Sequence, residues 1–304
     1  MSIKISIAVL SWNSKAITQD CLDSIIKNVT GCAYELIVIE NGSHDGSAQM
    51  LKDRYPANHY PQIKIIYNDT NLGFAGGNNQ AFALAAGEYF LLLNSDTVVP
   101  SGAIEDMVHW LDHQSQYGGA TTTLLNRDQT IQYYMHRRWP TAARLLLSLV
   151  YKRWSQFKPQ LVQDYLYLDY DFKHDRDIKQ AAGACLLVRS AIIKQFGQLL
   201  DDTHFPLYYN DVDLCYRLWQ AGWKIRCLTA HPITHLKGTS VRTLSWVKNG
   251  KEYTYASLWW FKKHQQWFDF WILRCSYLVL FIIVLPLAPL RVGSILKTIF
   301  TLQR

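Results

Sequence analysis

The sequence predicts an α/β fold in which helices flank a mostly parallel, Rossmann-like central sheet. Residues 3–10 are rich in β-branched side chains, as in a buried strand, and residues 35–40 repeat this pattern. The segment 15–28 between them has the length and composition of a helix. Strand, helix and strand at this spacing form a right-handed βαβ unit with parallel strands. A further apolar run, residues 89–93, is typical of a strand buried on both faces.

The run at 89–93 changes abruptly into Asn94, Ser95 and Asp96. This order delivers a carboxylate at the carboxyl end of a core strand. Open α/β sheets bind ligands there, because the loops that leave the strands converge on one crevice. An ordinary turn before the next helix is the alternative interpretation of these three residues.

Polar loops also follow the second strand and a third strand at 62–67. Glu40 closes the second strand, where a carboxylate can accept hydrogen bonds from a ribose or a base; a solvated strand end is the alternative. The loop at 68–79 contains three glycines and leads into an alanine-rich helix that ends near Ala86. Its backbone N–H groups favour an anion such as a diphosphate. The Gly-x-Gly-x-x-Gly pattern of dinucleotide-binding folds is absent, which disfavours a Rossmann dehydrogenase.

The region from 116 to 180 has the least regular pattern in the chain. It follows a helix expected at 101–116 and includes a mixed helical stretch at 143–175. Arg137 and Arg138 in this region are either phosphate contacts or part of a solvated basic loop.

Regular patterns return with a strand at 180–189, a helix at 210–221 and a strand at 222–228. Asp211 and Asp213 stand in the first turn of the helix. Acidic residues there are ordinary helix electrostatics or the sign of a functional carboxylate.

The composition of the 304 residues is that of a folded protein, since 49% of them are hydrophobic. Eleven Trp and eighteen Tyr favour a sugar-binding or membrane-interface surface, and the net charge of +7 suits anionic phosphate or lipid. Nucleic acid is disfavoured as a partner, because no known basic-aromatic nucleic-acid motif occurs. Six scattered cysteines without a Cys-x-x-Cys pair, and no export signal, indicate reduced thiols in a cytosolic setting.

The chain changes character in its C-terminal part. Residues 253–271 are rich in Trp and Phe interspersed with lysine, and residues 275–290 carry no charge. This uncharged run is shorter than the roughly 20 residues that a straight helix needs to cross a bilayer. Its aromatic and basic flanks indicate a helical segment that lies in, or dips into, the membrane interface. A helix docked on the rest of the protein is the alternative.

Four blocks of the sequence carry a resemblance to a known family. In their order and spacing they resemble family 2 glycosyltransferases of the GT-A fold, in particular the rhamnosyltransferase-like branch that builds bacterial surface polysaccharide such as O-antigen. The blocks are Ser11-Trp12-Asn13, residues 38–47, residues 71–79 and residues 92–97.

The resemblance implies a donor site with a divalent metal, Mn²⁺ or Mg²⁺. The family's base-contacting acid falls on Glu40, where Asp is usual, and its metal-binding Asp motif keeps only Asp96. His235, in a His-x-x-Gly-x-Ser pattern, resembles the family's metal-binding histidine and supplies the second metal ligand; a packed or surface histidine is the alternative. The implied donor-binding residues are Leu10, Trp12, Asn13, Glu40, Asn41, Gly73, Asn78, Ser95 and Asp96.

The resemblance also implies an acceptor site and a general base. The family has Glu-Asp-x-Asp-Leu at the start of the helix near 210 and uses the first Asp as the base. Asp211 takes that place, while Asn210 replaces the usual Glu. The implied acceptor-binding residues are Gly183, Ala184, Asn210 and Arg217.

The implied reaction is inverting, metal-dependent transfer of a sugar from a nucleotide-sugar donor to a saccharide or polyprenyl-diphosphate-linked saccharide. The resemblance favours dTDP-L-rhamnose as the donor, with a UDP-hexose as the alternative. A non-catalytic, membrane-associated protein that binds carbohydrate or nucleotide is the alternative from a different functional class.

The expected organisation is a GT-A domain over residues 1–245 and a helical, membrane-associating segment over 246–304. Within the domain, residues 1–118 form the nucleotide-sugar-binding half and residues 119–245 the acceptor-binding half. We expect the protein at the cytoplasmic face of the cell membrane, as a peripheral or monotopic protein.

Overall fold

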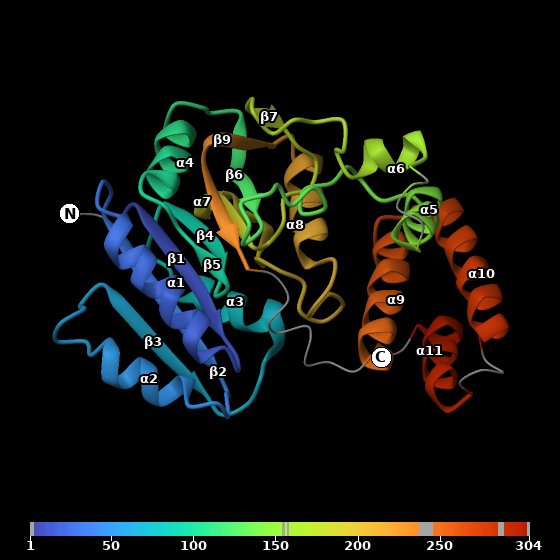
Figure 1. Cartoon of the computed structure of the whole chain (residues 1–304), viewed down its shortest axis with the longest axis horizontal. Coiled ribbons are helices and arrows are strands. Elements are labelled where there is room, and N and C mark those ends of the chain that lie inside the picture. Colours follow the sequence, from blue (N-terminus) through green and yellow to red (C-terminus); the bar gives the residue numbers. More distant parts are fainter. Residues whose placement is uncertain (1–2, 154–155, 157, 237–245, 285–288, 303–304) are drawn as a thin grey trace.

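The computed structural model describes residues 3–153, 156, 158–236, 246–284 and 289–302 (Figure 1). Within these residues a nine-stranded mixed sheet has the order β3-β2-β1-β4-β8-β6-β9-β5, with β7 paired to β9. The strands are β1 (Ile5–Ser11), β2 (Tyr34–Asn41), β3 (Ile63–Asn68), β4 (Tyr89–Asn94), β5 (Thr97–Val98), β6 (Tyr117–Leu125), β7 (Arg176–Asp177), β8 (Cys185–Arg189) and β9 (Lys224–His235). The helices are α1 (Lys15–Asn28), α2 (Ser47–Arg54), α3 (Gly73–Ala83), α4 (Ala103–Asp112), α5 (Ala142–Arg153), α6 (Gln160–Tyr165), α7 (Ser190–Phe196), α8 (Asn210–Gln220), α9 (Trp246–Lys263), α10 (Trp267–Val284) and α11 (Pro289–Thr301).

The strands β3, β2, β1 and β4 are parallel, which confirms the predicted βαβ arrangement. In this register Ser11 lies opposite Glu40, and Leu10 lies opposite Asn94. The loops after β1 and β2 and the turn after β4 therefore begin at the same edge of the sheet, where a ligand site was predicted.

The half of the sheet beyond β4 is mixed. Strand β8 is antiparallel to β4 and β6, β6 is parallel to β9, and β5 and β7 are antiparallel to β9. Strand β6 lies in the region where the sequence showed no regular pattern. It contains two glycines and three threonines, so it lacks the apolar pattern of a core strand although it is buried. The strand predicted to end at 228 continues to His235, and the stretch at 143–175 divides into α5, α6 and irregular chain.

Alternate side chains of β4 point into two different hydrophobic cores. Tyr89, Leu91 and Leu93 pack with α1, α2 and α4, whereas Phe90 and Leu92 pack with α3, α7 and α8. This period of two is what a strand covered by helices on both faces requires. It confirms the buried central strand that the sequence predicted.

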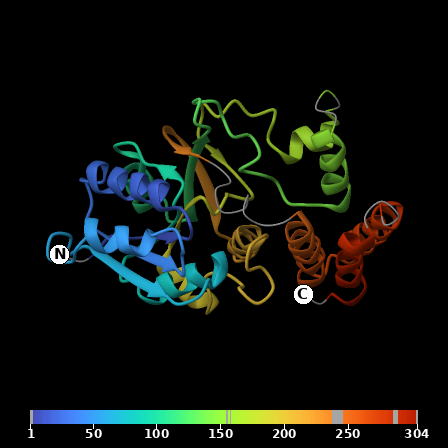
Figure 2. The same cartoon turned by 60° about the horizontal axis from the view of Figure 1, so that its bottom comes forward.

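A third hydrophobic cluster joins α8 to α5, α6 and the C-terminal helices. Trp260 and Phe261 of α9 are fully buried in it, together with Val212 of α8 and Phe270 of α10. Figures 1 and 2 show α8 between the sheet and this group of helices. The predicted segment 246–304 thus begins with a helix that packs against α8. The boundary predicted at 245/246 lies next to residues 237–245, outside the described residues, and it stays a prediction.

Asp213 ties α8 to the end of α9 through a buried group of charges. Its side chain is fully buried, and it lies 2.9 Å from Arg217 Nε, 2.8 Å from Lys263 Nζ and 3.0 Å from His264 Nε2. Burial acts to raise the pKa of Asp213. The hydrogen bond from His264 and the charges of Arg217 and Lys263 outweigh burial and lower the pKa to about 2.

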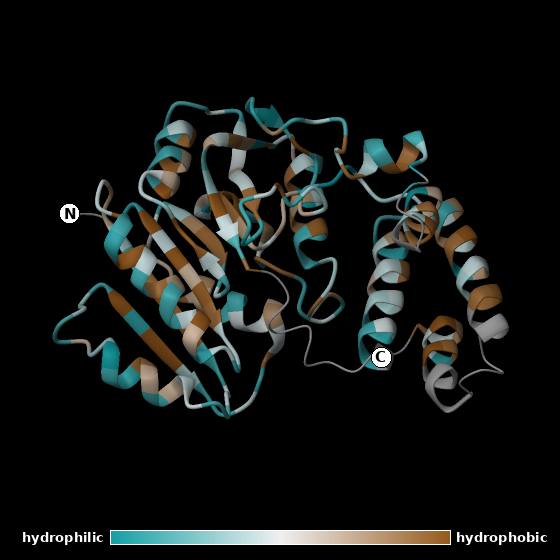
Figure 3. Cartoon of the chain, in the orientation of Figure 1, coloured by the Kyte–Doolittle hydropathy of each residue, from teal (hydrophilic) through white to brown (hydrophobic). Residues whose placement is uncertain are grey.

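Helix α10 is rich in apolar residues (Figure 3), some of which are buried while others are exposed. Leu273 and Tyr277 are buried, whereas the exposed side chains are Trp267, Phe268, Trp271, Ile272, Val279 and Leu280. In the part of the chain that the structure describes, no helix is long and apolar enough to cross a membrane. Both sequence-based alternatives, docking on the protein and contact with a membrane surface, are compatible with this combination of buried and exposed side chains.

We expect Asp213→Asn to lower the free energy of unfolding by about 3 kcal/mol, because it removes a fully buried carboxylate whose charge Arg217 and Lys263 neutralise; Lys263 keeps its second partner, Asp201. Chemical denaturation of the full-length protein measures the change. Since the native pKa is depressed, the stabilisation should be complete above about pH 4 and should be lost as the pH falls towards 2. Glu88→Gln is the control: it removes an exposed partner of Lys4 and should cost about 1 kcal/mol or less. Equal losses in both variants would contradict the role of Asp213.

Candidate active site

Hydrogen bonds join the loops that follow β1 and β2. The N–H of Asn13 donates to Ser43 Oγ (2.9 Å), and the N–H of His44 donates to Asn13 Oδ1 (2.8 Å). Asp45 Oδ2 accepts the N–H of Lys15 at 2.9 Å. Asn13 has a φ of 48°, a left-handed conformation that Asn adopts more readily than most residues. The two loops therefore form one connected surface at the sheet edge.

Asn41 joins the loop after β2 to the loop after β3. Its Nδ2 donates to Asn71 Oδ1 (2.8 Å), and its Oδ1 accepts the N–H of Leu72 (3.0 Å) and Nδ2 of Asn68 (3.2 Å). Gly73 follows with a φ of 76° and begins α3; its N–H donates to Asn71 Oδ1 (2.7 Å), and the N–H of Ala75 donates to the backbone oxygen of Pro206 (3.1 Å). Asn41 is buried, so its polar atoms brace the loops around the predicted donor site.

Glu40 is also buried, and both of its carboxylate oxygens bind its own loop. They accept the N–H groups of Gly42 (3.2 Å) and Ser43 (2.9 Å). The carboxylate thereby shapes the loop after β2. Its contact with a nucleotide base stays a prediction.

The other residues predicted to bind the donor lie at the same edge. Leu10 packs against α3, where Gly77 makes room for it, since a Cβ on Gly77 would collide with Leu10. Trp12 is partly exposed, and Asn78 and Ser95 are buried. The Nδ2 of Asn78 donates to a carbonyl of its own helix at 2.8 Å. Their positions agree with a donor site, and their contacts with a donor stay predictions.

Antiparallel pairing of β5 with β9 brings Asp96 and His235 together. Thr97 lies opposite His235, and the N–H of Leu236 donates to the backbone oxygen of Asp96 at 2.7 Å. The Nε2 of His235 lies 3.1 Å from Asp96 Oδ1, and both side chains are buried. Asn94 Nδ2 lies 3.3 Å from the same nitrogen. The structure thus places the two predicted metal ligands in contact.

The Asp96–His235 pair fits a cation such as Mn²⁺ or Mg²⁺. Neighbouring ligands at about 2.1 Å from an octahedral ion lie about 3.0 Å apart, close to the 3.1 Å between the two ligand atoms here. One imidazole nitrogen and one carboxylate oxygen leave the other positions to phosphate oxygens and water. No group of three His, Cys, Asp or Glu side chains suited to a metal occurs among the described residues. Gly238 and Ser240 of the histidine pattern lie outside the described residues.

Gln132, a residue that the sequence did not single out, holds His235 from the other side. Its Nε2 donates to the backbone oxygens of His235 (2.6 Å) and Leu125 (3.2 Å), and its Oε1 lies 3.0 Å from His235 Nδ1. Gln132 follows the turn after β6, in the region without a regular pattern. Only the fold brings it to His235.

Asp211 begins α8 with its carboxylate held by two backbone groups. Oδ2 accepts the N–H of Gly183 (3.1 Å), and Oδ1 accepts the N–H of Val212 (2.8 Å). Burial raises the pKa of Asp211 above its ordinary value, while the Gly183 N–H and the charge of Arg137 act in the opposite direction. A raised pKa makes the carboxylate a stronger base near neutral pH.

The start of β8 connects Asp211 to the turn that carries the predicted metal ligands. Gly183 binds Asp211, and the next residue, Ala184, accepts the N–H of Asn94 at 3.0 Å. A Cβ on Gly183 would lie 3.4 Å from Phe74 Cζ and 3.5 Å from Asp211 Cβ, so the first turn of α3 also reaches this point. The Asp211 carboxylate, the Asp96–His235 pair and the glycine loop therefore converge.

Two predicted acceptor residues have structural contacts of their own. Asn210 Oδ1 accepts the N–H of Asp211 (2.7 Å), which braces the start of α8. Arg217 donates to Asp213 Oδ2 (2.9 Å) and to the backbone oxygen of Gln198 (2.9 Å). The Arg217 guanidinium therefore neutralises the buried carboxylate of Asp213, one turn earlier in α8, and helps to hold this helix in place. Its predicted contact with the acceptor gains no support from this geometry.

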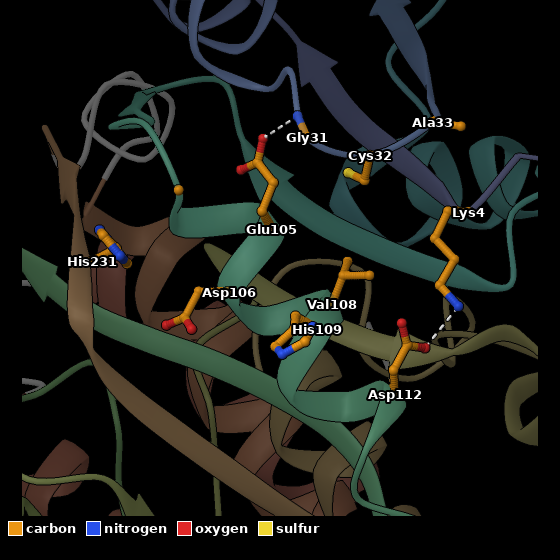
Figure 4. A pocket seen from close by; sticks show the side chains of 11 residues that line it. Lys4, Gly31, Cys32, Ala33, Glu105, Asp106, Val108, His109, Asp112 and His231 are labelled. Atoms are coloured by element: carbon orange, nitrogen blue, oxygen red, sulfur yellow. Dashed lines mark hydrogen bonds and ion pairs between the residues drawn. The ribbon is translucent and has the colours of Figure 1, made fainter.

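A separate hollow lies at the opposite edge of the sheet (Figure 4). It is lined by Lys4 before β1, by residues 31–33 before β2 and by α4. Figure 4 shows Glu105 bound to the Gly31 N–H and Lys4 paired with Asp112 across it. Because it lies at the amino ends of the parallel strands, this hollow is not part of the site around Asp96 and Asp211.

The family model of Glycosyl transferase family 2 matches residues 6–185, more than half of the chain. The chain therefore belongs to this family. It is a glycosyltransferase with a nucleotide-sugar donor, as the four sequence blocks predicted.

Relatives place the chain near the rhamnosyltransferase-like branch, which confirms that resemblance. The N-acetylglucosaminyl-diphospho-decaprenol L-rhamnosyltransferase of Mycobacterium tuberculosis is 27% identical over 219 residues, which cover 67% of each chain. The poly(ribitol-phosphate) beta-glucosyltransferase of Bacillus spizizenii is 33% identical over 104 residues, which cover 34% of this chain and 16% of that protein.

Solved structures show the GT-A fold. A mannosyltransferase from Pyrobaculum calidifontis, solved with GDP-Man and Mn²⁺, has a TM-score of 0.59 and 13% identity; the match covers 88% of this chain and 65% of that one. GalNAc-T7, solved with UDP, GalNAc and Mn²⁺, has a TM-score of 0.57 and 14% identity; the match covers 77% of this chain and 44% of the GalNAc-T7 chain. The chain thus spans less than two thirds of each solved chain.

Proposed function

We propose that the chain is an inverting, metal-dependent hexosyltransferase that moves L-rhamnose from dTDP-L-rhamnose to a saccharide or polyprenyl-diphosphate-linked saccharide. The observation that carries the proposal is the convergence of Asp211 with the Asp96–His235 pair at one sheet edge. The name of the mycobacterial relative supports rhamnose and a lipid-linked acceptor; a place in surface polysaccharide or O-antigen synthesis is part of the proposal. A UDP-hexose is the second candidate donor, since GalNAc-T7 was solved with UDP.

In this reaction Asp211 is the general base. Its carboxylate takes the proton from the acceptor hydroxyl as that oxygen attacks the anomeric carbon, and the bond to the nucleoside diphosphate breaks on the opposite face. The N–H groups of Gly183 and Val212 hold the carboxylate in one orientation. A single displacement of this kind inverts the anomeric centre.

Asp96 and His235 would hold the divalent cation, with Oδ1 and Nε2 as the atoms available to it. When bound, the cation neutralises the charge that develops on the departing diphosphate. The amino end of α3 adds the positive end of its helix dipole, although the N–H groups of Gly73 and Ala75 already donate to Asn71 Oδ1 and to the backbone oxygen of Pro206. Burial of the Asp96–His235 pair keeps water from competing with these contacts.

We further propose that the exposed face of α10 rests on the cytoplasmic surface of the cell membrane, where a lipid-linked acceptor would be found. Phe268 and Trp271 are 79% and 54% exposed, and aromatic side chains are favoured at the membrane interface. Arg274 lies over the Trp271 ring, with its guanidinium carbon 5.2 Å from the ring centre, and adds a cation for anionic head groups.

We expect Asp211→Asn to lower the rate of transfer by about 10²-fold or more, because general-base catalysis contributes at least that much. Donor affinity, measured by calorimetry, should stay nearly unchanged. In the wild type the rate should fall as the pH drops through the Asp211 pKa, which burial raises, because protonation removes the base. Near wild-type transfer by the variant at saturating donor would remove Asp211 from this role.

Asp96→Ala and His235→Ala should each weaken Mn²⁺-dependent binding of nucleoside diphosphate. The double variant should be little worse than either single variant, since both changes disable one site. Calorimetric titration with and without Mn²⁺ measures the effect. His231→Ala, in the same strand β9, is the control and should bind as the wild type does. Unchanged metal dependence in His235→Ala would refute the pairing.

We expect the full-length variant Phe268→Ser/Trp271→Ser to lose at least about tenfold in partitioning onto anionic vesicles, because each large apolar side chain gains roughly 2 kcal/mol on burial. Vesicle flotation measures this partitioning. Leu84→Ser, which removes a 43% exposed side chain on the nucleotide-sugar-binding half, should float as the wild type does. If the α10 variant also floats as fully, this face of α10 is not the anchor.

A further inference from the structure

We propose that Gln132 is a positioning residue for the metal site: it holds the His235 imidazole in the tautomer that leaves Nε2 unprotonated for the cation. The proposal rests on the metal-binding role proposed above for Asp96 and His235. It adds a residue that follows the turn after β6 and that neither the sequence pattern nor the family resemblance assigned to the site.

The orientation of the Gln132 carboxamide follows from its partners. One end lies 2.6 Å from the backbone oxygen of His235 and 3.2 Å from that of Leu125. Both are carbonyl oxygens, which can only accept hydrogen bonds, so the amide nitrogen must face them. In the opposite orientation the amide oxygen of Gln132 would face these two carbonyl oxygens, and no hydrogen bond could form. The amide oxygen therefore faces the imidazole.

The tautomer of His235 follows from that orientation. Gln132 Oε1 lies 3.0 Å from His235 Nδ1, and an amide oxygen only accepts, so Nδ1 carries the proton. In the neutral ring Nε2 then presents its lone pair. Nε2 faces Asn94 Nδ2, at 3.3 Å, and Asp96 Oδ1, at 3.1 Å, so a cation bound between the imidazole and the carboxylate would accept that lone pair. A metal-bound histidine commonly has this arrangement, with its second ring nitrogen bound to an acceptor.

The support for His235 is rigid because Gln132 is itself fixed. Gln132 is buried, and its N–H donates to the backbone oxygen of Leu124 at 2.9 Å. Its side chain joins the end of β6 to the end of β9, on the side of His235 away from Asp96. Asp96 Oδ1 contacts Nε2 of the ring and Gln132 Oε1 contacts Nδ1, so both ring nitrogens have a partner that fixes the imidazole.

A purely structural role for Gln132 would depend on the amide N–H bonds to the two carbonyl oxygens. A positioning role depends on the acceptor at Nδ1. Gln132→Glu separates the two, because a carboxylate keeps the acceptor and loses the donors. Gln132→Leu loses both, and Gln129→Leu is a matched control, since Gln129 bonds Thr234 of the same strand and not His235.

The first measurement is ¹⁵N NMR of histidine-labelled, metal-free, full-length protein at about pH 8.5, where an unperturbed imidazole is neutral. The His235 signal is assigned by its loss in His235→Ala. We expect a protonated Nδ1 in the wild type, Gln129→Leu and Gln132→Glu, and a shift towards unprotonated Nδ1 in Gln132→Leu, where the Asp96 carboxylate still faces Nε2. An unchanged tautomer in Gln132→Leu would overturn the proposal.

The second measurement is Mn²⁺ affinity in the presence of dTDP and, separately, UDP, followed by electron paramagnetic resonance. We expect Gln132→Leu to bind Mn²⁺ about 10- to 100-fold more weakly, the range found when an outer partner of a metal ligand is removed. Gln132→Glu should recover most of this loss. Equal binding by Gln132→Leu and the wild type, or a loss in Gln132→Glu as large as in Gln132→Leu, would overturn the role of Gln132. No Mn²⁺ binding by the wild type would overturn the metal site itself.

Discussion

The short antiparallel pairing of β5 with β9 places Thr97 opposite His235, and the N–H of Leu236 closes the contact on the backbone of Asp96. A carboxylate and an imidazole from distant parts of the sequence thereby meet at 3.1 Å in a buried place. In the proposed site a bound cation would join these two side chains. The rest of the site is arranged around this contact: Asn94 on one side of the imidazole, Gln132 on the other, and the donor loops beyond.

The remaining chemistry depends on the junction between the two halves of the sheet. Strand β8 is antiparallel to β4, and its approach at Gly183 and Ala184 bonds both Asp211 and Asn94. A Cβ at Gly183 would lie in ordinary van der Waals contact with Phe74 and Asp211, so the start of α3 and Asp211 lie close together at this point. Helix α8 carries Asp211, and it packs against the sheet on one side and against α9 on the other. The C-terminal helices thus support the position of Asp211 and also offer the exposed face of α10.

The sequence predicted the parallel half of the fold because its signals are local. Runs of β-branched residues, a glycine loop and the change from apolar strand to Asn94-Ser95-Asp96 are readable without knowledge of distant contacts. The second half was harder, since β6 is built from glycine and threonine and carries no apolar pattern. The family resemblance, more than the spacing, pointed to His235 and Asp211. Gln132 and the buried environment of Asp213 had no sequence signal, because both depend on segments that only the folded chain brings together.

Anomalous diffraction at the manganese edge, from crystals of the full-length protein grown with Mn²⁺ and dTDP, tests the central claim most directly. The structure predicts one manganese peak within bonding distance of Asp96 Oδ1 and His235 Nε2. The same ion should contact the nucleotide diphosphate, which should lie beside the start of α3 with Asp211 facing the open side of the site. A nucleotide bound at another edge of the sheet, or a manganese ion that touches the diphosphate and neither protein side chain, would contradict the account.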